Sequence, residues 1–253
     1  QGVAPGRTRL QAVLTTLCGA GCGLVLWVAL SSALLIGGTD TMRKLVDLQV
    51  WGLGLGVVLS ASGLGVLLPR PAIPGRWWLR GVIALALALA SGATLAFLHL
   101  RSQPDPSLLV VMVLMACGSA MTVVAALALL ETNEAGLGLP LRLVLALLGG
   151  ASLLFALITL RWQGPIPAAG PVPSLPVLLL VATRLLLAMW HARGGKRSWA
   201  QSRGCWFVLG LVTALPLLLA GLLYLQPGWA GAIWPLVAVS ILVGSVREHM
   251  QAY

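Results

Sequence analysis

The sequence SGLGVLLPRPAIPGRWWLRG (residues 62–81) is a short basic loop between two long apolar runs. It carries three arginines and two adjacent tryptophans within eleven residues. Arginine and tryptophan at the ends of apolar segments are typical of the membrane–water interface, where they anchor transmembrane helices. The same cations and aromatic rings also suit a docking or ligand site at the membrane surface. Which interpretation applies depends on the rest of the chain.

The composition of the whole chain indicates an integral membrane protein. Of its 253 residues, 59% are hydrophobic and only 9% are charged. Soluble domains carry about 25% charged residues, so this chain cannot cover itself with a water-facing surface. Its net charge of +10 lies mainly in short loops, a pattern that orients membrane proteins and does not indicate nucleic-acid binding.

Apolar segments of about 20 residues, enough to cross a bilayer as helix, recur eight times along the chain. Their predicted limits are residues 10–36, 48–68, 78–100, 108–130, 141–160, 174–192, 204–225 and 230–247. Glycine and proline punctuate the connections between them. The sequence therefore predicts an all-α, multi-pass bundle of eight transmembrane helices that forms one membrane domain over residues 1–253.

The distribution of lysine and arginine predicts the orientation of this bundle. With the loops assigned to alternate sides, eleven of these residues fall on the side of both termini and four on the other. An excess of lysine and arginine marks the cytoplasmic side. We therefore expect a bacterial inner-membrane protein with both termini in the cytoplasm.

Few residues in the apolar segments suggest a cofactor. The four cysteines lack the spacing of zinc ligands, so we expect no metal site. A haem with two histidine ligands needs both rings to point inward at one depth, and the pair His191 and His249 lies too near the headgroups, so no haem is expected. Arg184 lies in mid-segment, where it either pairs with another helix or marks a shifted boundary.

Five short motifs occur in an informative order along the chain. They are TTLCGAGCG (residues 15–23), LPRP (68–71), WLR (78–80), CGSAM (117–121) and REHMQAY (247–253). In this order the chain resembles the membrane-anchor subunits of the dimethyl sulfoxide reductase family, which also have eight helices. The matching motifs extend over about a third of the chain.

The resemblance implies an anchor subunit of a molybdopterin oxidoreductase complex. In that family the anchor is non-catalytic and has no cofactor of its own. It holds an iron–sulfur subunit and a molybdopterin catalytic subunit at the membrane and exchanges electrons with quinone. The family's histidine aligns with Leu67 and its acidic residue lies near Gly81, so the residue types that handle quinol protons are missing from this loop.

No catalytic residue is predicted in this chain, and the resemblance implies two functional surfaces. The predicted quinone site beneath the tryptophans consists of Arg70, Trp77, Trp78, Arg80, Cys117 and Met121. Arginine and tryptophan supply hydrogen-bond donors and an aromatic wall, but they are poor proton acceptors. The predicted docking surface for the iron–sulfur subunit consists of Arg76, Arg193, Lys196, Arg197, Arg247, His249 and Tyr253.

Two other functions remain open at this point. A purely structural anchor would dock a cytoplasmic enzyme without binding quinone. A small-solute transporter would need polar or broken helices that meet near the membrane midplane, often in an inverted repeat. No such repeat is evident, and Arg184 is the only charged residue predicted at mid-membrane depth.

Overall fold

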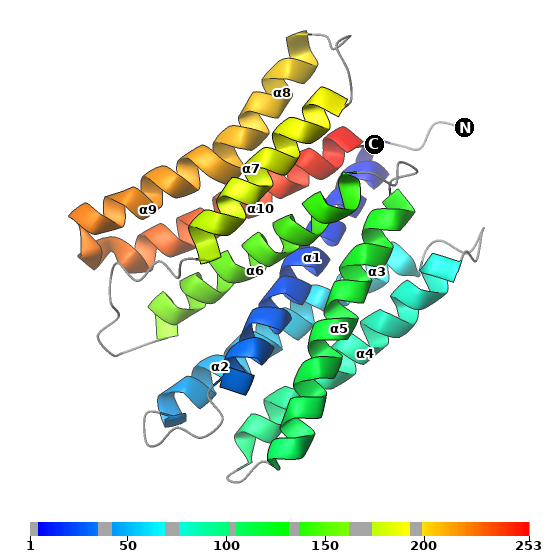
Figure 1. Ribbon diagram of the computed structural model, residues 1–253, viewed down its shortest axis with the longest axis vertical. Coiled ribbons are helices and arrows are strands. Elements are labelled where there is room, and N and C mark those ends of the chain that lie inside the picture. Colours follow the sequence, from blue (N-terminus) through cyan, green and yellow to red (C-terminus); the bar gives the residue numbers. More distant parts are fainter. Residues whose placement is uncertain are drawn as a thin grey trace.

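A computed structural model describes residues 5–34, 42–68, 76–101, 105–131, 137–161, 174–192 and 199–252. Nearly all of these residues are helical, and no strand occurs among them. The helices lie side by side in one bundle (Figure 1). The predicted all-α membrane bundle is therefore confirmed.

The described part of the chain forms ten α-helices with two short irregular turns. They are α1 (Pro5–Leu34), α2 (Met42–Ala61), α3 (Leu64–Leu67), α4 (Arg76–Leu100), α5 (Pro106–Glu131), α6 (Gly138–Arg161), α7 (Ser174–Ala192), α8 (Trp199–Leu209), the π-helical turn η1 (Gly210–Ala214), α9 (Leu215–Leu225), the 3-10 turn η2 (Pro227–Trp229) and α10 (Ala230–Ala252).

Seven helical stretches of the described residues are long and apolar enough to cross a membrane, one fewer than the eight predicted. The remaining predicted segment is α7, whose apolar part, Leu175–Met189, is shorter than the others. All of α7 still spans about 28 Å at 1.5 Å per residue, close to the roughly 30 Å of a hydrocarbon layer. With α7 counted, the described chain runs along the bundle eight times.

This even number of passages brings the start of α1 and the end of α10 to one end of the bundle, which we call the terminal end (Figure 1). The start of α4 lies there as well. The Ser62 hydroxyl, just before α3, donates to the Leu14 carbonyl of α1 over 3.0 Å, and the Trp78 Nε1 of α4 donates to the Leu67 carbonyl of α3 over 2.8 Å. Residues from the beginning and the end of the chain therefore meet at this end.

Helix α1 is the centre of the bundle and contacts α2, α5, α6 and α10. Its backbone touches that of α6 where Gly23 faces Gly150, because a Cβ added at either glycine would overlap the backbone of the opposite helix. Gly21 approaches α2 in the same way, near Gly56. Small residues of this kind allow close helix packing in membranes, where lipid gives helices little hydrophobic reason to associate.

The buried apolar side chains divide the bundle into two parts that share α6. One cluster joins α6 to α7, α8, η1, α9 and α10. Two others join α1 to α2, α3, α4 and α5, and Ala146 of α6 belongs to one of them. Helices α1 and α6 therefore form the seam between an early and a late half of the chain.

Helix packing compensates for a break between α8 and α9. In the π-turn each N–H bonds the carbonyl five residues back, as the Leu215 N–H does to Gly210. Pro216 follows and has no N–H for the Leu211 carbonyl. The Ser240 hydroxyl of α10 donates to that carbonyl over 2.6 Å instead, so a neighbouring helix supplies the missing donor.

Candidate functional site

A groove of about 370 Å³ lies between α4 and α5 on an outward face of the bundle. Its residues are Arg80, Ile83, Ala84, Leu87, Leu114, Met115, Gly118, Ser119 and Thr122. Several of its apolar side chains, Ile83, Leu87 and Leu114 among them, are exposed on the outside of the helices. In a membrane these side chains face lipid, so the groove opens toward the hydrocarbon layer.

Arg80 is the cation of this groove, and it lies one turn into α4 from the terminal end. Its guanidinium carbon lies 4.8 Å from the ring centroid of Trp77, within the range of a cation–π contact. Trp77 is exposed, whereas Trp78 is half-buried and fastened to α3. The two tryptophans therefore have different roles. Trp77 packs against Arg80, and Trp78 joins α4 to α3 through its hydrogen bond.

Of the five predicted quinone-site residues that the structure describes, one lines the groove. Arg80 lines it, and Trp77 lies against Arg80. Cys117 packs instead against the core cluster that includes Leu95 and Val113, and neither it nor Met121 belongs to the groove lining. Arg70 lies outside the described residues.

The predicted docking residues are only partly described. Arg76 and Arg247 are exposed, at the start of α4 and near the end of α10. Arg193, Lys196, Arg197 and Tyr253 lie outside the described residues. His249 is only 5% exposed, so its ring points into the bundle and does not form part of the outer surface.

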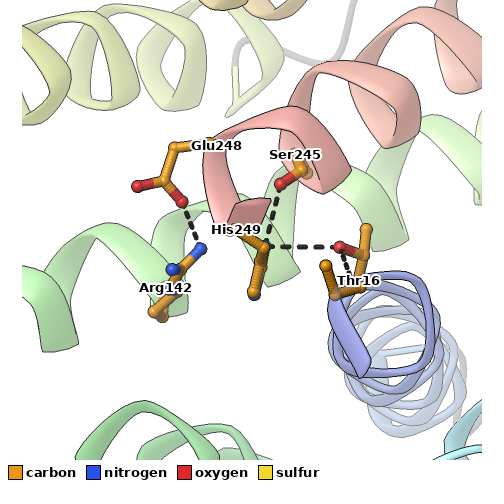
Figure 2. Close-up of polar contacts among 6 residues, drawn as sticks. Thr16, Arg142, Ser245, Glu248 and His249 are labelled. Atoms are coloured by element: carbon orange, nitrogen blue, oxygen red, sulfur yellow. Dashed lines mark hydrogen bonds and ion pairs between the residues drawn. The ribbon is translucent and has the colours of Figure 1, made fainter. Parts of the chain in front are cut away.

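A second polar site lies inside the bundle at the terminal end, and sequence analysis did not find it. Arg142 of α6 donates to the Glu248 carboxylate of α10, and both side chains are buried (Figure 2). Arg142 is one of the eleven basic residues predicted on the side of both termini, but its charge is paired in the interior. Glu248 had no predicted role of its own. One signal was available: an acidic residue directly beside a histidine at the end of an apolar segment.

His249, the residue after Glu248 in α10, occupies the same site (Figure 2). Its Nδ1 lies 2.8 Å from the Ser245 carbonyl oxygen and 3.3 Å from the Thr16 hydroxyl. The carbonyl can only accept, and the Thr16 hydroxyl already donates to the Ala12 carbonyl over 2.8 Å. Both contacts therefore require a proton on Nδ1, which leaves Nε2 as the acceptor nitrogen of the neutral ring.

Beside these residues lies a cavity of about 30 Å³. Its walls come from four helices: Thr15, Thr16, Gly19 and Ala20 of α1, Val124, Leu127 and Ala128 of α5, Arg142, Leu145 and Ala146 of α6, and Leu242, Ser245 and His249 of α10. The hydroxyls of Thr15 and Ser245 are buried here and have no hydrogen-bond partner among the described residues.

The groove and the cavity lie on opposite faces of α5. At 100° per residue, the groove positions 114, 115, 118, 119 and 122 cluster on one side of the helix. The cavity positions 124, 127 and 128 fall about 200° away. One face of α5 therefore borders lipid, and the other borders the polar interior.

Cys18, Cys22 and Arg184 are weaker candidates for a functional site. Cys18 and Cys22 are buried in α1, and the described residues contain no cluster of histidine, cysteine or acidic side chains that could hold a metal ion. Arg184 is exposed on α7 and makes no ion pair within the described part of the chain. Both interpretations of Arg184 therefore stay open.

Comparisons with family models, with curated proteins and with solved structures found no match for this chain. The resemblance to the dimethyl sulfoxide reductase anchors consequently stays a prediction from the sequence motifs.

Proposed function

We propose that this chain is the membrane anchor subunit of a molybdopterin and iron–sulfur oxidoreductase complex, and that the α4–α5 groove binds a quinone head group. The observation that carries the proposal is the groove itself: a largely apolar cleft with a single arginine near the membrane surface. The sequence motifs independently point to the same class of anchor.

The size and chemistry of the groove suit a quinone. Its volume of about 370 Å³ lies within the range of small-molecule sites, roughly 300–1,000 Å³. Arg80 can donate to a quinone carbonyl, and the apolar residues toward Leu114 provide a path for an isoprenoid tail. The internal cavity, at about 30 Å³, is too small for any such ring.

The groove residues are better suited to bind a quinone than to exchange protons with it. Arginine stays protonated, and the hydroxyls of Ser119 and Thr122 donate to carbonyls of their own helix. The carboxylate and imidazole of Glu248 and His249 lie in the interior, beyond α5. A quinone at Arg80 would therefore exchange its protons with water at the membrane surface.

Electron exchange requires the iron–sulfur subunit to dock near Arg80. Exposed basic residues at the terminal end, Arg9, Arg76 and Arg247, offer charge for such a contact. The lysine and arginine bias of the sequence supports a cytoplasmic location for this end in a bacterial inner membrane. The molybdopterin subunit would then lie beyond the iron–sulfur subunit, away from the bilayer.

The test is quinone binding by purified complexes that carry Arg80→Ala or, as a matched control, Arg101→Ala. Both arginines are exposed and lie over an aromatic ring of α4, Trp77 and Phe97 respectively, but only Arg80 lines the groove. Loss of one charged hydrogen bond costs about 1.5–3 kcal/mol, so Arg80→Ala should weaken a quinone analogue roughly ten- to hundredfold. Arg101→Ala should bind it as the unmodified complex does.

Activity with an artificial dye separates electron exchange from damage to the soluble subunits. Arg80→Ala should keep dye-linked turnover and lose quinone-linked turnover at low quinone concentration. Equal affinity in both variants and in the unmodified complex would contradict the quinone site. The chain would then be a structural anchor whose Arg80 binds lipid phosphate.

A further inference from the structure

We propose that the cavity between α1, α5, α6 and α10 is a water-binding site, and that its water places the imidazole of His249 in proton exchange with the solvent. The ligand is one or two water molecules held by the hydroxyls of Thr15 and Ser245. This inference does not rest on the proposed quinone site, which lies on the other face of α5.

The cavity has the right size for water. A buried water needs about 10–15 Å³ of space measured in this way, and the cavity offers about 30 Å³. This volume admits one or two water molecules and nothing much larger. Apolar cavities of comparable or larger size stay dry, so size alone does not decide the occupant.

The polar groups on the cavity wall indicate that the occupant is water. Thr15 is 5% exposed and Ser245 is 3% exposed, and neither hydroxyl has a partner among the described residues. A buried hydroxyl without a hydrogen bond destabilises the fold, so two such hydroxyls on one small cavity would be a heavy penalty if the cavity were empty. A water molecule between them satisfies both, and two to four polar partners are what a buried water requires.

The surrounding charges favour water over an ion. Arg142 and Glu248, the charged residues described at this site, are paired with each other, so the cavity has no net charge to attract a small ion. Thr16 also lines the cavity and accepts the His249 Nδ1 proton, a bond of 3.3 Å that the ring shares with the Ser245 carbonyl. A water in the cavity can therefore reach the imidazole directly or through one hydroxyl.

The cavity lies close enough to the terminal end for water to enter. Thr15 is six residues from the exposed Arg9, about 9 Å along α1. His249 is two residues from the exposed Arg247. A proton taken up by the neutral ring from a hydronium ion in the cavity would leave imidazolium and water behind, and the reverse step would return it.

The first test is an experimental structure of the intact chain in lipid nanodiscs, at a resolution that shows ordered water. One or two density peaks within hydrogen-bond distance of Thr15 Oγ1 and Ser245 Oγ are expected. A cavity without density, or one filled by a moved Leu242 side chain, would overturn the proposal.

The second test measures magnetisation transfer from water to the ring protons of His249 in histidine-labelled protein. Thr15→Val and Ser245→Ala together remove both hydroxyls, and the transfer should fall by about tenfold or more because a dry apolar cavity holds no exchanging proton. Thr94→Val is the control, since the exposed Thr94 hydroxyl bonds only the Ala90 carbonyl of its own helix.

Each substitution is also made alone, because the double variant changes two helices at once. A single variant that folds as the unmodified chain does, by thermal unfolding in detergent, should already reduce the transfer. Equal transfer in the unmodified chain and in all folded variants would mean that His249 exchanges by another route, and the proposal would be wrong.

Discussion

The outer groove and the inner cavity lie on the two sides of α5, and each has one arginine in its lining, in a different environment. Arg80 is exposed at the mouth of the groove and lies over the ring of Trp77. Arg142 is buried against Glu248, beside a cavity whose lining residues are mostly buried. Both lie at the terminal end, and in the sequence both are basic residues next to apolar segments.

The difference shows that position in the bundle, not residue type, decides what an arginine does here. A cation at the surface can change partners freely, so it suits a ligand that comes and goes. A cation in the interior must keep its counter-charge, because removal of one partner leaves the other buried and uncompensated. The groove is therefore suited to exchange, and the interior site to holding α6 and α10 together.

The largest effect should come from separating Arg142 and Glu248. Arg142→Leu or Glu248→Leu alone should lower the free energy of unfolding by about 3–5 kcal/mol, since each removes the ion-pair partner of a buried charge. The double variant should recover most of this loss, because two apolar side chains leave no charge behind. Equilibrium unfolding in mixed detergent micelles measures all three. Equal and additive losses would mean that the two residues act independently.

A smaller effect should distinguish the glycines on the two sides of the bundle. Gly150→Ala forces a methyl group into the backbone of α1 and should destabilise the chain by about 1–3 kcal/mol. Gly118→Ala in the groove meets nothing within 4 Å and should instead stabilise α5 by about 0.5–1 kcal/mol. Thermal unfolding compares them. A loss of stability in Gly118→Ala would show that the groove is closed by something in the membrane.

Removal of a hydroxyl group should likewise cost more stability in the interior of the bundle than in the groove. Ser240→Ala leaves the Leu211 carbonyl without the donor that Pro216 cannot supply, at a cost of about 1–3 kcal/mol. Thr122→Val removes a hydroxyl from the groove, where it bonds only the Gly118 carbonyl of its own helix, and should change stability by less than about 0.5 kcal/mol. Hydrogen exchange of the α9 amides gives a local measure. Unchanged exchange in Ser240→Ala would mean that water replaces the serine.

The smallest effect on stability is expected for Arg80→Ala, the variant with the largest expected effect on quinone binding. The side chain is exposed, so the free energy of unfolding should change by less than about 0.5 kcal/mol. Arg80 is therefore expected to act in ligand binding, and Arg142 in the stability of the fold. A loss above about 2 kcal/mol in Arg80→Ala would place this arginine in the structure, and the comparison would no longer hold.

The sequence predicted the bundle well because hydrophobicity reports directly on burial in lipid. Segment 174–192 coincides with α7, and 78–100 begins two residues after the start of α4. The described residues of the predicted quinone site lie on α4 and α5, as the groove residues do, but only Arg80 belongs to both sets, and the quinone site stays a prediction. A helix turns 100° per residue, so a motif such as CGSAM contains groove residues and core residues side by side.

The interior site was harder to predict, because its members lie far apart in the chain. Arg142 and Glu248 are separated by 106 residues, and Thr16 and His249 by 233. Hydropathy places each residue at the end of a segment but does not say which segments are neighbours. That information depends on how α1, α6 and α10 pack, and the hydropathy of a single sequence does not reveal it.

The contact between Gly23 and Gly150 has a consequence for how the protein is made. Helix α1 is synthesised before α2, α3, α4 and α5, and all of these are synthesised before α6. During this interval the glycine face that will receive α6 borders lipid or an insertion factor. Biogenesis therefore has a step in which the early half of the chain closes on α6, and the Arg142–Glu248 pair can form only after α10 has been inserted.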